Sequence, residues 1–121
     1  MTTPAASLAA VGIGLKPRHV PEILGSGAPL DFFEVHAENY MVPGGPYPRH
    51  LERIREGFAL SVHGVGLSIG GAGPLDIRHL DRLDALARRF EPQWFSEHLA
   101  WSGHGGAFYN DLLPVPYNQA S

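Results

Sequence analysis

Short runs of apolar residues alternate with longer amphipathic stretches along this chain, and glycine and proline separate them. Brief apolar runs bounded by turn residues are typical of β-strands. The chain has such runs at residues 11–15, 30–36, 58–63 and 93–98. Apolar spacing and terminal glycine or proline indicate helices at residues 18–24, 48–56 and 74–90. Residues 1–10 are expected to form a flexible N-terminus, and loops are expected at residues 37–47, 64–73 and 99–121.

The predicted order of elements is β-α-β-α-β-α-β, which favours an α/β fold with a parallel sheet and right-handed crossovers. A small doubly wound sheet fits this order. So does the N-terminal half of a TIM-type (β/α)8 barrel, whose usual length is about 250 residues. No predicted helix follows the fourth strand, which would leave a sheet edge exposed to mispairing. This edge favours a partial barrel over residues 11–121, with about four strands.

The composition of the chain argues against several classes of function. The formal net charge is -3 and no basic run occurs, so neither nucleic acid nor a membrane is an expected partner. The chain has no cysteine, which excludes disulfides and thiolate metal ligands and fits a cytoplasmic protein. Any metal would therefore need nitrogen or oxygen ligands, and the seven histidines supply nitrogen.

The strongest chemical signal is a repeated Ser-x-His pattern at the ends of two predicted strands. Ser61 and His63 end one strand, and Ser96 and His98 end the next. Alternate side chains share a strand face, and the carboxyl ends of parallel strands meet at one edge of a sheet. Neighbouring strands lie about 4.8 Å apart, so one metal ion can be shared by both imidazoles. Each histidine taken alone has a plainer interpretation, as a strand-end side chain bonded to a carbonyl group.

Two further polar residues share one face of the second predicted strand. Glu34 and His36 are expected to face inward if the intervening residues pack on helices. An inward carboxylate is costly unless it is paired. Glu34 would then either orient a ligand histidine or form an internal salt bridge, with Lys16 or an arginine.

Other candidates lie outside the strand interiors. Glu38 and Asn39 directly follow the second strand, where barrel active sites are assembled, although such residues also favour simple turns. Asp111 lies in the last predicted loop, which we expect to close over the pocket. Glu97 has the parity of the helix-facing side and is expected to form a salt bridge there. His79 falls on the third predicted helix and is expected to be solvated.

Five glycines lie in residues 64–73, directly after the third predicted strand. Glycine-rich loops at this position can bind phosphate, but no Gly-Lys-Ser/Thr follows. We interpret the glycines as backbone clearance beside the site.

Five segments in a fixed order carry a family resemblance: Gly12-Ile13-Gly14-Leu15, residues 33–40 (FEVHAENY), residues 61–68 (SVHGVGLS), residues 96–101 (SEHLAW) and residues 110–114 (NDLLP). With them, the chain resembles the multinuclear non-haem iron-dependent oxidases, a bacterial family whose best-known type is the methanobactin biosynthesis oxidase. The resemblance extends over about residues 11–118 and implies a triosephosphate-isomerase-type barrel related to xylose isomerase.

The resemblance also implies a chemistry. Family members hold two or three iron ions and use dioxygen to oxidise cysteines of small precursor peptides, often with a separate protein that presents the peptide. On that pattern, His63 and His98 match the two histidine ligands of the N-terminal half, and Glu34, His36, Glu38, Asn39 and Asp111 are candidates for supporting or substrate-contacting roles.

The length of the chain departs from the family pattern. The remaining ligands come from strands five to eight, so this chain is expected to be a truncated barrel that is inactive alone. Two alternatives are another divalent-metal-dependent barrel enzyme, such as an isomerase or endonuclease, and a non-catalytic half-barrel that self-associates through its exposed edge.

Overall fold

The computed structural model describes residues 10–42 and 44–120, so the expected flexible N-terminus lies almost entirely outside the described residues. Four strands form a parallel sheet in sequence order: β1 (Gly12–Gly14), β2 (Phe32–His36), β3 (Ala59–Gly64) and β4 (Trp94–Glu97). The connections hold α1 (Val20–Ser26), α2 (Pro46–Gly57) and α3 (Ile77–Phe90), with 3-10 helices η1 (Pro17–His19) and η2 (Ala37–Tyr40). The predicted alternation of strands and helices is confirmed.

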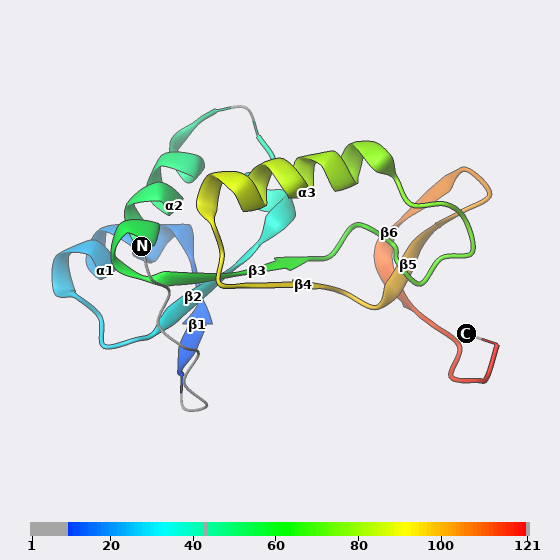
Figure 1. Ribbon diagram of the computed structural model, residues 1–121, viewed down its shortest axis with the longest axis horizontal. Coiled ribbons are helices and arrows are strands. Elements are labelled where there is room, and N and C mark those ends of the chain that lie inside the picture. The colour runs from blue at the N-terminus through cyan, green and yellow to red at the C-terminus, as the bar shows by residue number, and fades with distance from the viewer. Residues whose placement is uncertain (1–9, 43, 121) are drawn as a thin grey trace.

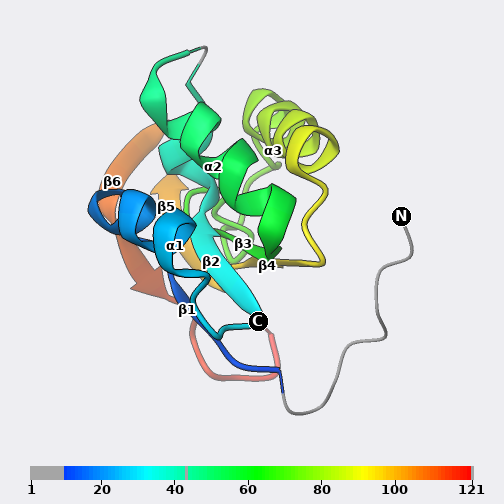
Figure 2. The ribbon, with the colours of Figure 1, turned by 90° about the vertical axis from the view of Figure 1, so that its left-hand side faces the viewer.

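All three α-helices pack on one face of the sheet (Figure 2). Side chains alternate along β2 and β3, so that Phe33, Val35, Leu60 and Val62 are buried on the face that the helices cover. The helices contribute a matching apolar layer: Val20 and Ile23 from α1, Leu51 and Ile54 from α2, and Leu83, Leu86 and Phe90 from α3. The opposite face of the strands carries the polar residues of the candidate site.

The third helix begins later than its sequence pattern predicts. Asp76 is extended (φ -72°, ψ 105°), and its carboxylate accepts hydrogen bonds from the backbone N–H groups of Arg78 and His79. This N-cap starts the helix at Ile77, and Pro74 lies before it. Among the described residues, no helix is both long enough and apolar enough to cross a bilayer.

Residues 99–121 are not simply a loop, as the sequence pattern predicts. They contain an antiparallel hairpin of β5 (Ala100–His104) and β6 (Ala107–Pro114). Gly105 and Gly106 have φ angles of 58° and 81°, which suit a two-residue hairpin turn. The hairpin lies beyond the carboxyl ends of β3 and β4 (Figure 1). It therefore extends the molecule at the edge where the candidate site lies.

Ser68 joins this hairpin to the loop after β3. Its Oγ accepts hydrogen bonds from the N–H groups of Ser102 at 2.8 Å and Gly103 at 3.4 Å. The N–H of Gly70 donates to the carbonyl of Ala100 at 2.9 Å. Ser68 has a φ of 58°, a left-handed conformation that is uncommon for a residue with a side chain. The loop therefore adopts a strained conformation that its contacts with the hairpin hold in place.

Candidate metal site at the carboxyl edge of the sheet

Three imidazoles form a row at the carboxyl edge of the sheet. The parallel register makes His36 the partner of His63 and places Ser96 opposite His63 on the other side. The ring centroids of His36 and His63 are 6.0 Å apart, and those of His63 and His98 are 5.8 Å apart. The structure thus brings together the two histidines that the Ser-x-His pattern singles out, and His36 extends the row.

The ring spacing of His63 and His98 is that of two imidazoles bound to one ion. Two imidazoles bound to a single ion at about 2.0–2.1 Å have ring centroids roughly 5–6 Å apart. The Nδ1 atom of His63 is hydrogen-bonded to Ser96 Oγ at 2.8 Å, which leaves its Nε2 for a ligand. Within residues 10–42 and 44–120, no three histidine or carboxylate side chains surround one ion position. Metal binding by these histidines therefore stays a prediction.

Glu34 has neither of the two partners that the sequence suggests. Its Oε2 accepts a hydrogen bond of 2.9 Å from the Ser61 hydroxyl, and among the described residues it forms no ion pair with Lys16 or an arginine. The register explains this arrangement, because Glu34 and Ser61 are paired on adjacent strands and point to the same face. The Glu34 carboxylate therefore has a hydrogen-bond partner within the sheet, two residue pairs before the histidine row.

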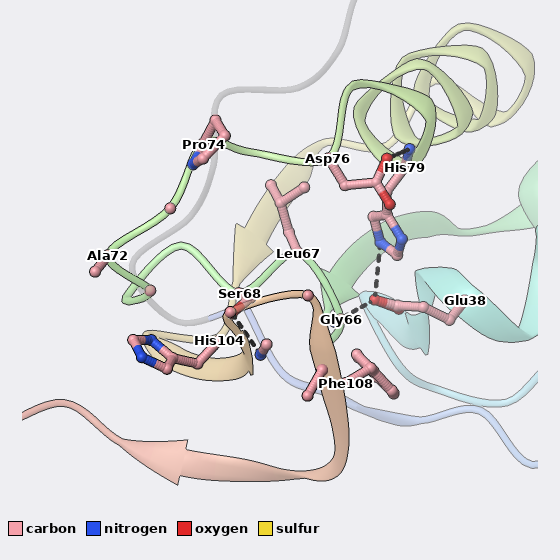
Figure 3. A pocket seen from close by; sticks show the side chains of 16 residues that line it. Glu38, Gly66, Leu67, Ser68, Ala72, Pro74, Asp76, His79, His104 and Phe108 are labelled. Carbon is pink, nitrogen blue, oxygen red and sulfur yellow. Dashed lines mark hydrogen bonds and ion pairs between the residues drawn. The ribbon is translucent and has the colours of Figure 1, made fainter.

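Glu38 binds the loop that follows His63. Its Oε1 accepts hydrogen bonds of 2.7 Å from the N–H groups of both Val65 and Gly66. His79 Nε2 lies 3.6 Å from the same oxygen (Figure 3). The expectation that His79 is solvated is wrong, since its side chain is only 15% exposed. Helix α3 carries it inward against Glu38.

The other candidates near this loop lie apart from the histidine row. Asn39 is exposed on η2. Asp111 lies on β6, where its Oδ1 accepts from the N–H of Leu112 at 2.8 Å. It does not line the cavity of about 750 Å³ between residues 66–76 and the hairpin turn. A strand replaces the predicted loop there, and the expectation that this segment closes over a pocket stays a prediction.

Glu97 faces the helix-covered side, as its parity indicates, but the expected salt bridge is absent from the described residues. Its Oε1 instead accepts a hydrogen bond of 3.2 Å from the N–H of Leu67. Burial raises the pKa of the Glu97 carboxyl above its ordinary value, and the negative charge of Glu38 raises this pKa further. The hydrogen bond from the Leu67 N–H and the nearby His79 and His63 lower the same pKa, but each by less than burial raises it. Glu97 and Glu38 thus form two neighbouring, partly buried carboxylates.

The glycines after β3 provide the backbone clearance that the sequence suggests. A Cβ at Gly64 would collide with the Glu97 carboxylate, and one at Gly66 would lie 3.2 Å from the His79 ring and 3.3 Å from Glu38 Oε1. The N–H groups of residues 65–67 already donate to these two carboxylates. The loop therefore binds the protein's own anions at the positions where a phosphate loop would bind a nucleotide.

Sequence reasoning missed two contacts at this site, that of His79 with Glu38 and that of Glu97 with the loop. Neither has a local signal, because periodicity assigns a face to a residue but not a partner from another element. The Asp76 cap is the nearest clue, since it places His79 in the first turn of α3.

Comparison with known proteins identifies the family. Residues 10–121 match the profile of the family described as "RiPP precursor modification enzyme MbnB/TglH/ChrH". The chain belongs to this family.

Relatives with the printed name UPF0276 protein support the assignment. One from Paraburkholderia phytofirmans is 56% identical over 113 residues, which is 93% of this chain and 37% of that protein. One from Bordetella pertussis is 53% identical over 119 residues, 98% of this chain and 41% of that protein. One from Caulobacter sp. is 54% identical over 110 residues, which is 91% of this chain and 40% of that protein. The chain therefore spans about two fifths of the length of these relatives.

Proposed function

We propose that this chain contributes the histidine-bearing part of an iron-dependent oxidase that modifies cysteines of a small ribosomal precursor peptide with dioxygen. The observation that carries the proposal is the pair His63 and His98, whose ring centroids lie 5.8 Å apart at the carboxyl edge of a parallel sheet. Active sites of α/β barrels are built at this edge. The family description supplies the substrate class, a precursor peptide.

We further propose that the four strands belong to the N-terminal half of a (β/α)8 barrel of the xylose isomerase type. Two features support this architecture over a doubly wound sheet. Among the residues that the structure describes, the strand order is sequential without a reversal point, and all α-helices lie on one face of the sheet. On the same helix-facing side of β4, Phe95 is 48% exposed, as expected for a strand whose own helix would follow later in the chain.

His63 and His98 would hold an iron ion in this protein, with His63 oriented by Ser96 through its other ring nitrogen. Bound iron supplies the one-electron chemistry and the affinity for dioxygen that oxidation beside a thiol requires. A complete site of two or three ions needs further ligands from outside these residues. His36 lies next to His63, with ring centroids 6.0 Å apart, and would support the site from the β2 side.

Metal analysis of the anaerobically purified 121-residue chain tests the proposal. We expect iron in the wild type and its loss in His63→Ala and in His98→Ala, with His19→Ala, an exposed histidine of η1, as the matched control. Iron retained by both site variants would refute the ligand assignment. A protein of the relatives' full length, given iron, dioxygen and a cysteine-containing precursor peptide, should then change the mass of that peptide. No mass change would count against the oxidase.

A non-catalytic half-barrel that self-associates is the second candidate, and the exposed apolar side chains of Phe95, Leu99 and Phe108 favour it. It predicts a size that grows with concentration in light scattering. Turnover that depends on a divalent metal but consumes no dioxygen would instead indicate an isomerase or endonuclease.

A further inference from the structure

We propose that Glu97 is a positioning residue, which together with Glu38 fixes His63 relative to His98 by clamping residues 65–67. The inference rests on the proposed metal site, and it concerns how that site is held rather than which residues bind the ion. The clamp joins the end of β4 to the loop that follows β3 on the side of the sheet opposite the imidazoles.

The clamp consists of three consecutive backbone donors and two carboxylates. Glu38 Oε1 accepts from the N–H groups of Val65 and Gly66, each at 2.7 Å, and Glu97 Oε1 accepts from the N–H of Leu67 at 3.2 Å. Hydrogen bonds to a charged acceptor are stronger than those between neutral groups. The first three residues after β3 are therefore held by side chains from η2 and β4.

Glu97 also completes a double connection between the two histidine-bearing strand ends. The backbone N–H of His98 donates to the carbonyl of Gly64 at 2.8 Å, which continues the β3–β4 ladder. The Glu97 side chain adds a second bond, to Leu67, and its carboxylate packs against the Cα of Gly64. The Glu97 bond thus adds a side-chain connection to the backbone ladder at these strand ends and restricts their relative motion.

The arrangement carries an electrostatic cost, which argues that it does more than stabilise the fold. The Oε2 atoms of Glu38 and Glu97 are buried and have no hydrogen-bond partner among the described residues. Two carboxylates that share a partly buried site repel each other. His79, at 3.6 Å from Glu38, offsets this repulsion only when its ring is protonated. A neutral side chain of the same shape would hold the loop at lower cost.

The test uses the 121-residue chain with Glu97→Ala, the isosteric Glu97→Gln, and Glu52→Ala as a control. Glu52 is a half-exposed carboxylate on α2 that pairs with Arg89, so its removal changes the net charge equally. Three quantities are measured by nuclear magnetic resonance and titration: amide exchange at Leu67, the nuclear Overhauser contact between the His63 and His98 rings, and affinity for iron(II) under argon.

Glu97→Ala should accelerate Leu67 exchange, remove the ring contact and weaken iron(II) binding by about 10–100-fold, the usual effect of losing a group that orients a ligand. Glu97→Gln, which keeps an acceptor oxygen, should preserve all three quantities, and Glu52→Ala should leave them unchanged. If Glu97→Ala accelerates Leu67 amide exchange but leaves the contact between the His63 and His98 rings intact, Glu97 has no positioning role. If Glu97→Ala leaves Leu67 amide exchange unchanged, the clamp itself is refuted. A wild type that shows the ring contact but binds no iron(II) would refute iron binding by this histidine pair without further ligands, while the ring contact would still test the clamp.

Discussion

Replacing Gly64 with alanine tests the close packing of Glu97 against β3. The φ angle of Gly64 is not positive, so alanine suits the backbone, but its Cβ would occupy the position of the Glu97 carboxylate. A side-chain terminus is flexible, so the carboxylate should swing toward solvent. The substitution would then break the hydrogen bond between the Leu67 N–H and Glu97 Oε1 without changing Glu97 itself.

The magnitude follows from three contributions. Loss of a hydrogen bond to a charged group costs about 1.5–3 kcal/mol, with the lower end expected for a bond of 3.2 Å. Replacing glycine with alanine returns about 0.4–1 kcal/mol through the unfolded state. Release of a partly buried carboxylate from its neighbour Glu38 returns a further part. The expected net destabilisation of Gly64→Ala is roughly 0.5–2 kcal/mol.

The assay is urea denaturation followed by circular dichroism, with Gly25→Ala as the matched control. Gly25 lies in α1, and a Cβ added there would meet no atom within 4 Å, so alanine should stabilise by about 0.5–1 kcal/mol. The two glycine-to-alanine changes are thus expected to have opposite signs. In a Glu97→Ala background, Gly64→Ala should become neutral or stabilising. A Gly64→Ala variant as stable as the wild type, or equal losses in both backgrounds, would refute the reasoning.

Two further predictions concern other parts of the chain. Ser68→Ala removes the acceptor of the Ser102 N–H and should cost about 0.5–1.5 kcal/mol, with faster amide exchange confined to the hairpin; unchanged exchange there would contradict it. Burial, and then the neighbouring Tyr47, raise the pKa of Tyr40 above its ordinary value. The folded state therefore holds this proton more tightly, so stability should fall as the pH rises from about 10 through the raised value. Melting temperatures between pH 9 and 11.5 should fall less steeply for Tyr40→Phe than for the wild type, and Tyr117→Phe, at a fully exposed position, should match the wild type.

The sheet and its helices could be predicted from the sequence because their signals are local. Brief apolar runs located all four parallel strands, and helical spacing placed Leu83, Leu86 and Phe90 on the buried side of α3. Leu80 follows the same three- and four-residue spacing but is 40% exposed. Helical spacing therefore predicts which face of a helix is apolar, but the packing of the other elements determines how much of that face is buried.

The sequence pattern does not predict the hairpin, although its turn carries a signal. Gly105 and Gly106 form a two-residue loop of the kind that favours hairpins, but the flanking residues mix glycine, serine and aromatic side chains rather than alternating regularly. Strand pairing here depends on the partner strand and on Ser68, which binds β5 from a distant loop. A contact between residues this far apart in the sequence cannot be predicted from a short window of neighbouring residues.

The candidate site shows how one dipeptide can serve two purposes. Successive residues at a strand end point to opposite faces, so Glu97 and His98 cannot act on the same side of the sheet. His98 joins the imidazole row, and Glu97 binds the loop that carries the neighbouring histidine strand onward. A residue inserted between them would turn one side chain to the wrong face, whereas an insertion in the hairpin would leave both in place. The strict adjacency of these two residues is therefore a requirement of strand geometry, and it links the position of a candidate ligand to the bond that holds the neighbouring loop.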